Sequence, residues 1–246
     1  MKKIILPLLL LMTNLFIFAE KEPFILKGKQ LWEKRHSPEK ALEAMKIFHQ
    51  AAYESQEKDY ESLCLFAYSS NFYAKFFEKD KDQKEDFYLK ASKASQKAIS
   101  LNPNGMEAHL LLGISYAELA QLNKSLSYIE KAKEVFEWIE KKSPDYQNGF
   151  ALMVLGRLYS KAPGWPISFG DDDLSLKYFE KAMAISKKLR FTYLYYAEAL
   201  FDAGENQKAL EILRTGIKLP VNEKELTEEN YCLAKMKKLE KEILED

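Results

Sequence analysis

The chain has 246 residues, with 37 Lys and Arg against 37 Asp and Glu, and 47% of its residues are hydrophobic. This length suits one compact domain or one repeat array. The balanced charge excludes proteins that depend on a clustered basic face, such as nucleic-acid binders, and it argues equally against binding to an anionic membrane surface.

The first nineteen residues predict a secretory signal peptide. Lys2 and Lys3 are followed by the largely apolar stretch Ile4–Phe18 and by the small residue Ala19. This stretch is too short and too interrupted for a membrane span. Ile17 stands where a small residue is preferred, so an uncleaved anchor is the alternative. The apolar run has no Cys near its end, which excludes a lipid-modified amino terminus. We therefore expect an exported, periplasmic protein with one domain over residues 20–246 and a net charge near −2.

The mature part of the chain has the periodicity of α-helices. Apolar residues recur at intervals of three and four, and no run alternates like a strand. The sequence predicts about eleven helices. The expected helical segments include a first helix around Trp32, then Ala44–Ala51, Tyr60–Phe77 and Ala91–Ile99, with Glu223–Glu245 as a solvent-facing cap at the carboxyl end.

Three later segments repeat one pattern of small and large residues. Each begins with a small residue and ends on another small residue in a second helix: Gly113 to Ala132, Gly156 to Ala182, and Ala197 to Gly216. The spacing is nineteen residues in the first and third segments and twenty-six in the middle one. The middle segment thus carries seven extra residues.

This pattern resembles the tetratricopeptide repeat (TPR), in which two antiparallel helices pack small residues against large ones and neighbouring pairs stack. Gly113 and Gly156 would let the partner helix approach closely, and Tyr116 and Tyr159 would fill the space beside them. The resemblance predicts an all-α array of TPR-like helical hairpins in a single domain.

The extra residues fall in a loop that contains Pro163, Gly164, Trp165 and Pro166. Two prolines on either side of Gly-Trp stiffen the backbone, so Trp165 is presented by a rigid turn. Two interpretations are open for this loop, including its later residue Phe169. It can fill the groove between helix pairs as core, or it can form the wall of a ligand cavity.

Gly156 and Arg157, the segment 162–170, and Ala182 together are similar to the signature of the periplasmic TPR component associated with TRAP-type transporters. The similarity extends over nearly the whole mature chain, including Asn102 and Pro103. It implies repeats that enclose a cleft or pore, a small homo-oligomer, and a solute-binding protein as partner. It also implies delivery of a small, apolar, carboxylate-bearing ligand. Such proteins are often lipoproteins, and this chain departs from that pattern.

Arg157 is the residue best suited to a ligand carboxylate, because a guanidinium forms bidentate hydrogen bonds with carboxylates. The alternative is that Arg157 pairs with a nearby acidic side chain or points to solvent. The aromatic clusters Phe72-Tyr73, Phe76-Phe77 and Tyr193–Tyr196 can line a pocket or form core. The residues that we expect at a ligand site are Tyr116, Arg157, Tyr159, Pro163, Gly164, Trp165, Pro166, Phe169 and Tyr193.

Other candidate sites have simpler interpretations. Asp171, Asp172 and Asp173 lack the ligand spacing of a calcium loop, so we expect one of them to cap the helix that opens at Leu174. Cys64 and Cys232 fit two buried free thiols, and a disulfide is the alternative for an exported protein. The three histidines are isolated, and no catalytic motif is present. We expect no metal, no cofactor and no enzymatic activity.

Two functions remain open from the sequence. The first is a TPR accessory component of a TRAP-type uptake system, which binds or passes a small apolar carboxylate and docks the solute-binding protein. The second is an exported TPR scaffold for envelope proteins, with no small ligand.

Overall fold

The computed structural model describes residues 24–55 and 57–245, and within these ranges the chain is helical and has no strand. The predicted signal peptide lies outside the described residues. A first helix covers residues 24–32. It is followed by α2 (Pro38–Glu54), α3 (Tyr60–Phe76), α4 (Lys81–Leu101), α5 (Met106–Asn123), α6 (Leu126–Lys142), η1 (Tyr146–Asn148), α7 (Phe150–Lys161), α8 (Asp172–Ile185), α9 (Arg190–Asp202), α10 (Asn206–Ile217), η2 (Glu223–Glu225) and α11 (Leu226–Glu245). No helix in the described part is both long and apolar enough to cross a bilayer.

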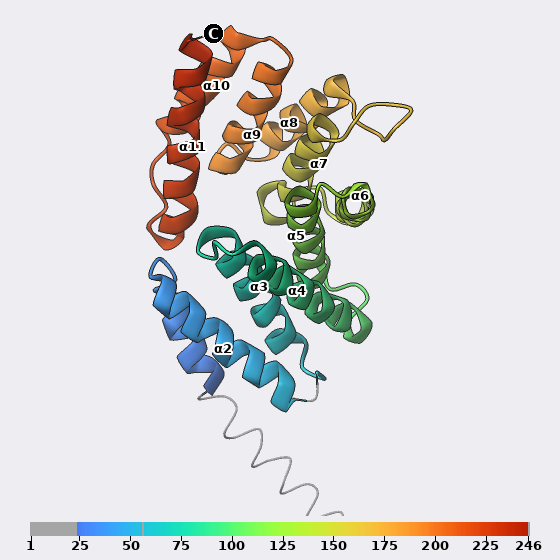
Figure 1. Cartoon of the computed structure of the whole chain (residues 1–246), viewed down its shortest axis with the longest axis vertical. Coiled ribbons are helices and arrows are strands. Elements are labelled where there is room, and N and C mark those ends of the chain that lie inside the picture. Colours follow the sequence, from blue (N-terminus) through green and yellow to red (C-terminus); the bar gives the residue numbers. More distant parts are fainter. Residues whose placement is uncertain (1–23, 56, 246) are drawn as a thin grey trace, which may run out of the picture.

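The helices pair in chain order, as expected for TPR-like hairpins. α3 packs on α4, α5 on α6, α7 on α8 and α9 on α10. Figure 1 shows these pairs arranged around a central region, with α11 on one side and α5 to α8 on the other. The predicted helical-repeat fold is confirmed.

Two glycines account for the close approach within the hairpins. A Cβ at Gly113 would lie 2.8 Å from the Phe136 ring, and one at Gly156 would lie 3.0 Å from the Phe179 ring. The ring that covers each glycine therefore comes from the second helix of the hairpin. We expected Tyr116 to fill the space beside Gly113. It packs instead beside Tyr128 of α6, with 5.8 Å between the ring centroids.

The helix starts follow the capping chemistry of short polar side chains. Five helices begin after a Ser or Asp whose side chain accepts a hydrogen bond from a backbone N–H of the first turn: Ser37, Asp59, Asp80, Ser125 and Asp171. Asp171 accepts from the N–H of Leu174 at 2.8 Å. The predicted aspartate cap is therefore confirmed, although α8 begins two residues earlier than expected, at Asp172.

A buried arginine holds the carboxyl-terminal helices together. The side chain of Arg190, at the start of α9, is 2% exposed and donates to the Glu229 carboxylate on α11 at 2.6 Å. The same guanidinium donates to the carbonyls of Gly216, at the end of α10, and of Leu219 and Pro220 beyond it. One side chain thus satisfies carbonyls that the end of α10 leaves free, and it fixes α11.

α11 is more than the solvent-facing cap that the sequence predicted. Its residues Cys232, Met236, Leu239 and Ile243 are buried, because their spacing of three and four places them on one face of the helix. This face packs against α9 and α10, so the prediction of a helix that faces solvent is wrong for this side of α11. Residues 223–225, expected to start this helix, form η2.

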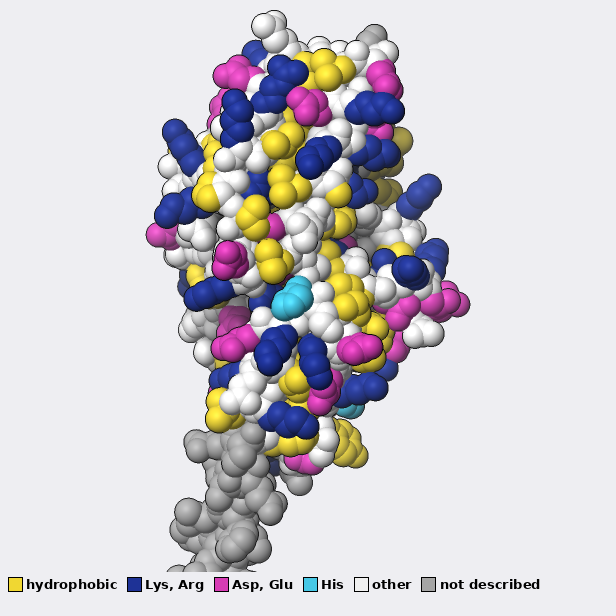
Figure 2. Space-filling view, turned by 90° about the vertical axis from the view of Figure 1, so that its left-hand side faces the viewer, with side chains coloured by type: hydrophobic (Ala, Val, Ile, Leu, Met, Phe, Trp, Pro, Cys, Tyr) yellow, Lys and Arg dark blue, Asp and Glu magenta, His cyan; other side chains and the backbone are white. Residues whose placement is uncertain are grey.

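The amino-terminal end of α11 also reaches the amino-terminal part of the chain. Arg35 and Glu228 form an ion pair at 3.2 Å, and the rings of Phe76 and Tyr231 meet edge to face at 5.5 Å between centroids. The array therefore closes on itself, because α11 joins the last hairpin, α9 and α10, to Arg35 and to α3. On the face that Figure 2 shows, acidic and basic side chains are interspersed, with short runs of apolar atoms between them.

Replacing Arg190 with Leu should lower the free energy of unfolding by about 3–5 kcal/mol, because Glu229 would stay buried without a partner. The matched control is Arg214→Leu, which removes another arginine–glutamate pair between α10 and α11. That pair joins Arg214, whose side chain is 54% exposed, to Glu240. We expect a loss of no more than about 1 kcal/mol there. Urea unfolding of both variants measures the difference, and equal losses would contradict the role of Arg190.

Gly216→Val should destabilise the fold by about 1–3 kcal/mol through overpacking. A Cβ at this position would lie 2.5 Å from Met236 on α11 and 2.6 Å from Tyr193 on α9. Thr215→Val introduces the same residue at the neighbouring exposed position and should change stability little. The thermal midpoints of the two variants provide the comparison, and an unchanged midpoint for Gly216→Val would show that the helices are not closely packed there.

Candidate functional site

The closure of the array leaves a pocket of about 960 Å³ on its inner side. Its walls come from α3, α5, α7, the start of α9 and the start of α11. Most of the wall is apolar, and its side chains include Phe76, Ile114, Phe150, Val154 and Phe191. The structure thus has a pocket, and an enclosed cleft or pore stays a prediction.

A lysine–glutamate pair lies in the wall between α3 and α5. The Lys75 ammonium donates a hydrogen bond to the Glu118 carboxylate, and the hydroxyl of Tyr88 donates to the other oxygen of Glu118 at 3.3 Å. Burial of the ammonium opposes its charge, but the charge and hydrogen bond of Glu118, together with the nearby Tyr195 and Tyr231, outweigh this effect and raise the pKa of Lys75. The Lys75 ammonium is therefore kept charged and is paired with Glu118.

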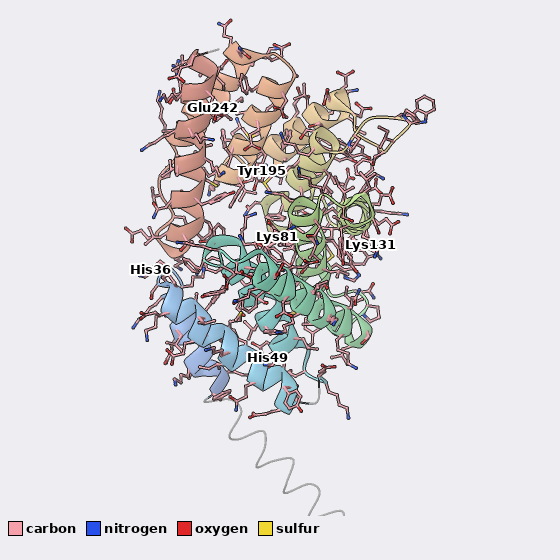
Figure 3. All side chains as sticks on the ribbon, viewed as in Figure 1. His36, His49, Lys81, Lys131, Tyr195 and Glu242 are labelled. Atoms are coloured by element: carbon pink, nitrogen blue, oxygen red, sulfur yellow. The ribbon has the colours of Figure 1, made fainter. Side chains whose placement is uncertain are left out.

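A second pair lies in the wall between α7 and α9. Arg157 donates to the Glu198 carboxylate at 2.8 Å, and its guanidinium carbon lies 3.7 Å from the centroid of the Tyr195 ring. Burial raises the pKa of the Tyr195 hydroxyl, with Lys75 and Arg157 partly offsetting that rise. In Figure 3, Tyr195 lies between α11 and α7, in the central region of the array. Tyr195 is thus a neutral phenol between two cations.

A third pair stands where α11 meets the amino-terminal hairpin. The Arg35 guanidinium lies 5.5 Å from the Trp32 ring and 5.6 Å from the Phe72 ring, besides its ion pair with Glu228. Burial raises the pKa of the Glu228 carboxyl, with Arg35 partly offsetting that rise. Tyr68 faces the same region, and its burial raises the pKa of its hydroxyl to about 12.

The electrostatic consequence is a pocket whose central charges cancel. Lys75, Arg157 and Arg190 each have a carboxylate partner within the fold. A charged ligand that binds one of these three cations would have to displace its carboxylate partner. One pocket-lining group, the Glu228 Oε2 atom, is buried without a hydrogen-bond partner among the described residues. The pocket therefore combines a mainly apolar wall with cations that are paired within the fold.

The expected ligand residues are distributed between the pocket and the rest of the fold. Arg157 and Pro163 line the pocket. Arg157 also has the acidic partner that was its alternative interpretation. A role for Arg157 in ligand binding stays a prediction.

The three expected tyrosines pack away from the pocket lining. Tyr159 stacks on Tyr178, with 5.5 Å between ring centroids. The hydroxyl of Tyr116 accepts a hydrogen bond from Gln96 at 2.7 Å, and that of Tyr193 donates to the carbonyl of Lys187 at 3.0 Å. Their hydroxyls thus serve contacts within the fold.

The Pro-Gly-Trp-Pro loop connects α7 and α8, as the seven-residue insertion predicted. Gly164, Trp165 and Pro166 are exposed, and the Trp165 side chain is 90% exposed. Trp165 is therefore not the core residue that one interpretation expected, because the loop projects outward in place of folding back over the helices (Figure 1). Phe169, at the base of the loop, packs edge to face on Tyr159 at 5.2 Å. A ligand role for this loop stays a prediction.

Sequence reasoning did not single out Lys75 and Glu118, whereas Tyr195 belongs to the aromatic cluster Tyr193–Tyr196 that could line a pocket. Lys75, Glu118 and Tyr195 come from three helices and meet only in the folded chain. A weak signal was present, since Lys75 interrupts an aromatic run and Glu118 lies on a helix rich in leucine and alanine. Ionisable residues on such faces are expected to be paired when buried.

No group of three or more metal-binding side chains gathers within residues 24–55 and 57–245. Figure 3 shows His36 and His49 well separated along the amino-terminal hairpin. Cys64 and Cys232 are buried free thiols, so the disulfide alternative does not hold in this structure.

Comparisons with known proteins identify the family and support the fold. Residues 24–161, more than half of the chain, match the family described as Regulator of microtubule dynamics protein 1-3 (RMD1-3). The chain belongs to the RMD1-3 family. The matched region of this RMD1-3 chain runs from the first described helix to the end of α7. It therefore includes Arg157 but not the exposed loop or α11.

Solved structures support the same fold. The RMD1-3 chain is similar to a thermophilic TPR protein of Thermus thermophilus, with 17% identity, a TM-score of 0.62, and coverage of 88% of this chain and 98% of that one. It is also similar to the MamA protein, with 15% identity, a TM-score of 0.50, and coverage of 85% and 95%. No curated protein matches the chain. These findings support a TPR-type protein and do not confirm the transporter-associated family.

The two thiols should be unreactive in the folded protein at pH 8.5. Burial raises the pKa of Cys64 to about 12 and also raises that of Cys232, so the reactive thiolate is nearly absent. An aromatic disulfide reagent should therefore detect no thiol in buffer and two in urea. Two thiols reacting rapidly in buffer would show that α3 and α11 are open. No thiol in urea would indicate a disulfide.

Proposed function

We propose that the chain is an exported interaction scaffold that holds a short apolar segment of a partner protein in its inner pocket. The TPR fold supports a protein-interaction scaffold in general. The observation that carries the finer proposal is the large apolar pocket whose central charges are internally paired. Apolar grooves of helical proteins commonly take up amphipathic segments of partners.

The chemistry of the wall defines the expected partner segment. Phe76, Ile114 and Phe191 are only partly buried, so their apolar surface is open to a guest. Removal of that surface from water is the main source of affinity. The partner segment should therefore bring apolar or aromatic side chains. The family's name, regulator of microtubule dynamics, is consistent with action through protein partners.

A second candidate is a small apolar molecule with one carboxylate, passed on to the solute-binding protein of a TRAP-type transporter. The pocket volume lies near the upper end of the range for small-molecule sites, about 300–1,000 Å³. Arg157 stands in the wall and would exchange Glu198 for the ligand carboxylate. This candidate uses the same pocket but binds a small molecule in place of a protein segment.

A photo-crosslinking amino acid at Phe191, introduced into the mature chain, tests the first proposal. Irradiation with envelope extract should give a discrete protein adduct, with the cross-link in an apolar segment. Ile114→Asp should reduce the adduct at least about tenfold, because it puts a charge in the apolar wall. The matched control is Leu244→Asp at an exposed apolar position of α11, which should leave the adduct unchanged.

The same purified chain distinguishes the two candidates. Native mass spectrometry should show the unliganded mass if the pocket serves proteins. A bound small carboxylic acid that is lost in both Ile114→Asp and Arg157→Gln would support the uptake candidate. An adduct that survives Ile114→Asp, or no adduct and no ligand, would refute a binding role for the pocket.

A further inference from the structure

The loop between α7 and α8 leaves its most apolar side chains in water. Trp165 is 90% exposed and Ile167 is 68% exposed, and they stand two residues apart at the tip. An isolated exposed apolar residue is ordinary, but an indole and an isoleucine together on a projecting loop form a localised apolar surface. Only Pro163 of this loop lines the inner pocket, so the tip is a separate surface.

The loop is held in one shape by its own backbone. The N–H of Gly170 donates to the carbonyl of Pro163 at 2.9 Å, and the N–H of Ile167 donates to the carbonyl of Gly164 at 3.1 Å. The two ends of the loop approach so closely that a Cβ at Gly170 would overlap the Ala162 carbonyl oxygen. The tip thus keeps its form without being covered by the rest of the chain.

The base of the loop is anchored to α7 and α6. The N–H of Asp171 donates to the carbonyl of Tyr159 at 3.1 Å, and the Phe169 ring packs on Tyr159. The ammonium of Lys133 lies 5.3 Å from the centroid of the Phe169 ring. Phe169 therefore fixes the base, and Trp165 contributes little to that anchoring. A preformed surface loses little conformational entropy when it binds.

The first turn of α8, directly after the loop, is acidic. Asp172 and Asp173 are exposed in the first turn of α8, and neither forms an ion pair within the described part of the chain. Asp171 is used as the helix cap. Two lysines near the base of the loop have other partners, Glu137 for Lys133 and Asp202 for Lys161. Lys177, one turn after Asp173 on α8, is exposed. A binding partner would thus meet an apolar tip and, at the base of the loop, two exposed carboxylates.

We propose that the loop over residues 162–171 is a docking element for a second, folded protein. The partner would have an apolar socket for the Trp165 indole, bordered by Lys or Arg side chains that face Asp172 and Asp173. Charge complementarity selects this occupant, because the two aspartates would be repelled by an anionic bilayer. The proposal is independent of any guest in the inner pocket.

A photo-crosslinking amino acid at Ile167 in the mature chain tests the docking element, since it leaves Trp165 in place. Irradiation with envelope extract that contains membranes should yield one discrete protein adduct. Digestion of the adduct should map the cross-link next to Lys or Arg residues of the partner. Trp165→Ala should reduce the yield about thirtyfold, as expected for a central aromatic anchor. Asp172→Asn with Asp173→Asn should reduce it several-fold, and so should higher salt.

The controls separate docking from folding and from the inner pocket. Leu244→Ala, at another exposed apolar position, should leave the yield unchanged, and Trp165→Ala should keep the urea midpoint of the parent chain. Ile114→Asp should also leave the yield unchanged, so failure of the pocket proposal would not affect this result. An adduct only with lipid, an adduct only with a second copy, no adduct, or a protein adduct insensitive to the aspartate changes would each overturn the proposal.

Discussion

The inner pocket depends on where one buried arginine holds α11. Arg190 joins the start of α9, the carbonyls after α10 and Glu229 of α11 within one hydrogen-bonded cluster. A guanidinium can serve these acceptors together because its donors diverge in one plane. With α11 fixed at this point, Glu228 pairs with Arg35 and Tyr231 packs on Phe76 of α3. α11 thereby joins the two ends of the repeat array, and the pocket lies on the inner side of that array.

The stacking of neighbouring hairpins pairs the charges in the pocket wall. It packs α5 on α3 and α9 on α7, so that Lys75 meets Glu118 and Arg157 meets Glu198. Buried charges are tolerated only when they are paired. The remaining wall is apolar and partly accessible, which suits a hydrophobic guest. The docking loop follows the opposite principle, since its apolar tip is exposed and its acidic neighbours have no cationic partner among residues 24–55 and 57–245.

Local patterns predicted the hairpins well, because spacing and capping act over a few residues. Gly113, Gly156 and the aspartate cap before α8 behave much as the sequence indicated. The pocket was harder to predict, because Lys75, Glu118 and Tyr195 lie on three separate helices. The direction of the Trp165 loop was also open, since two prolines predict stiffness but not whether a turn faces inward or outward. α11 was predicted as a helix, but its bridging contact depends on Arg35, nearly two hundred residues earlier in the chain.

The most direct test of the closed architecture is a distance measurement between its two ends. Nitroxide labels at His36→Cys and Asn230→Cys would stand on the two sides of the closing contact, and the buried native thiols would stay unlabelled. Double electron–electron resonance should give one narrow distribution of short distances, which broadens when Arg190 is replaced by Leu. A broad distribution reaching long distances in the chain that keeps Arg190 would contradict the closed array and the pocket that it forms.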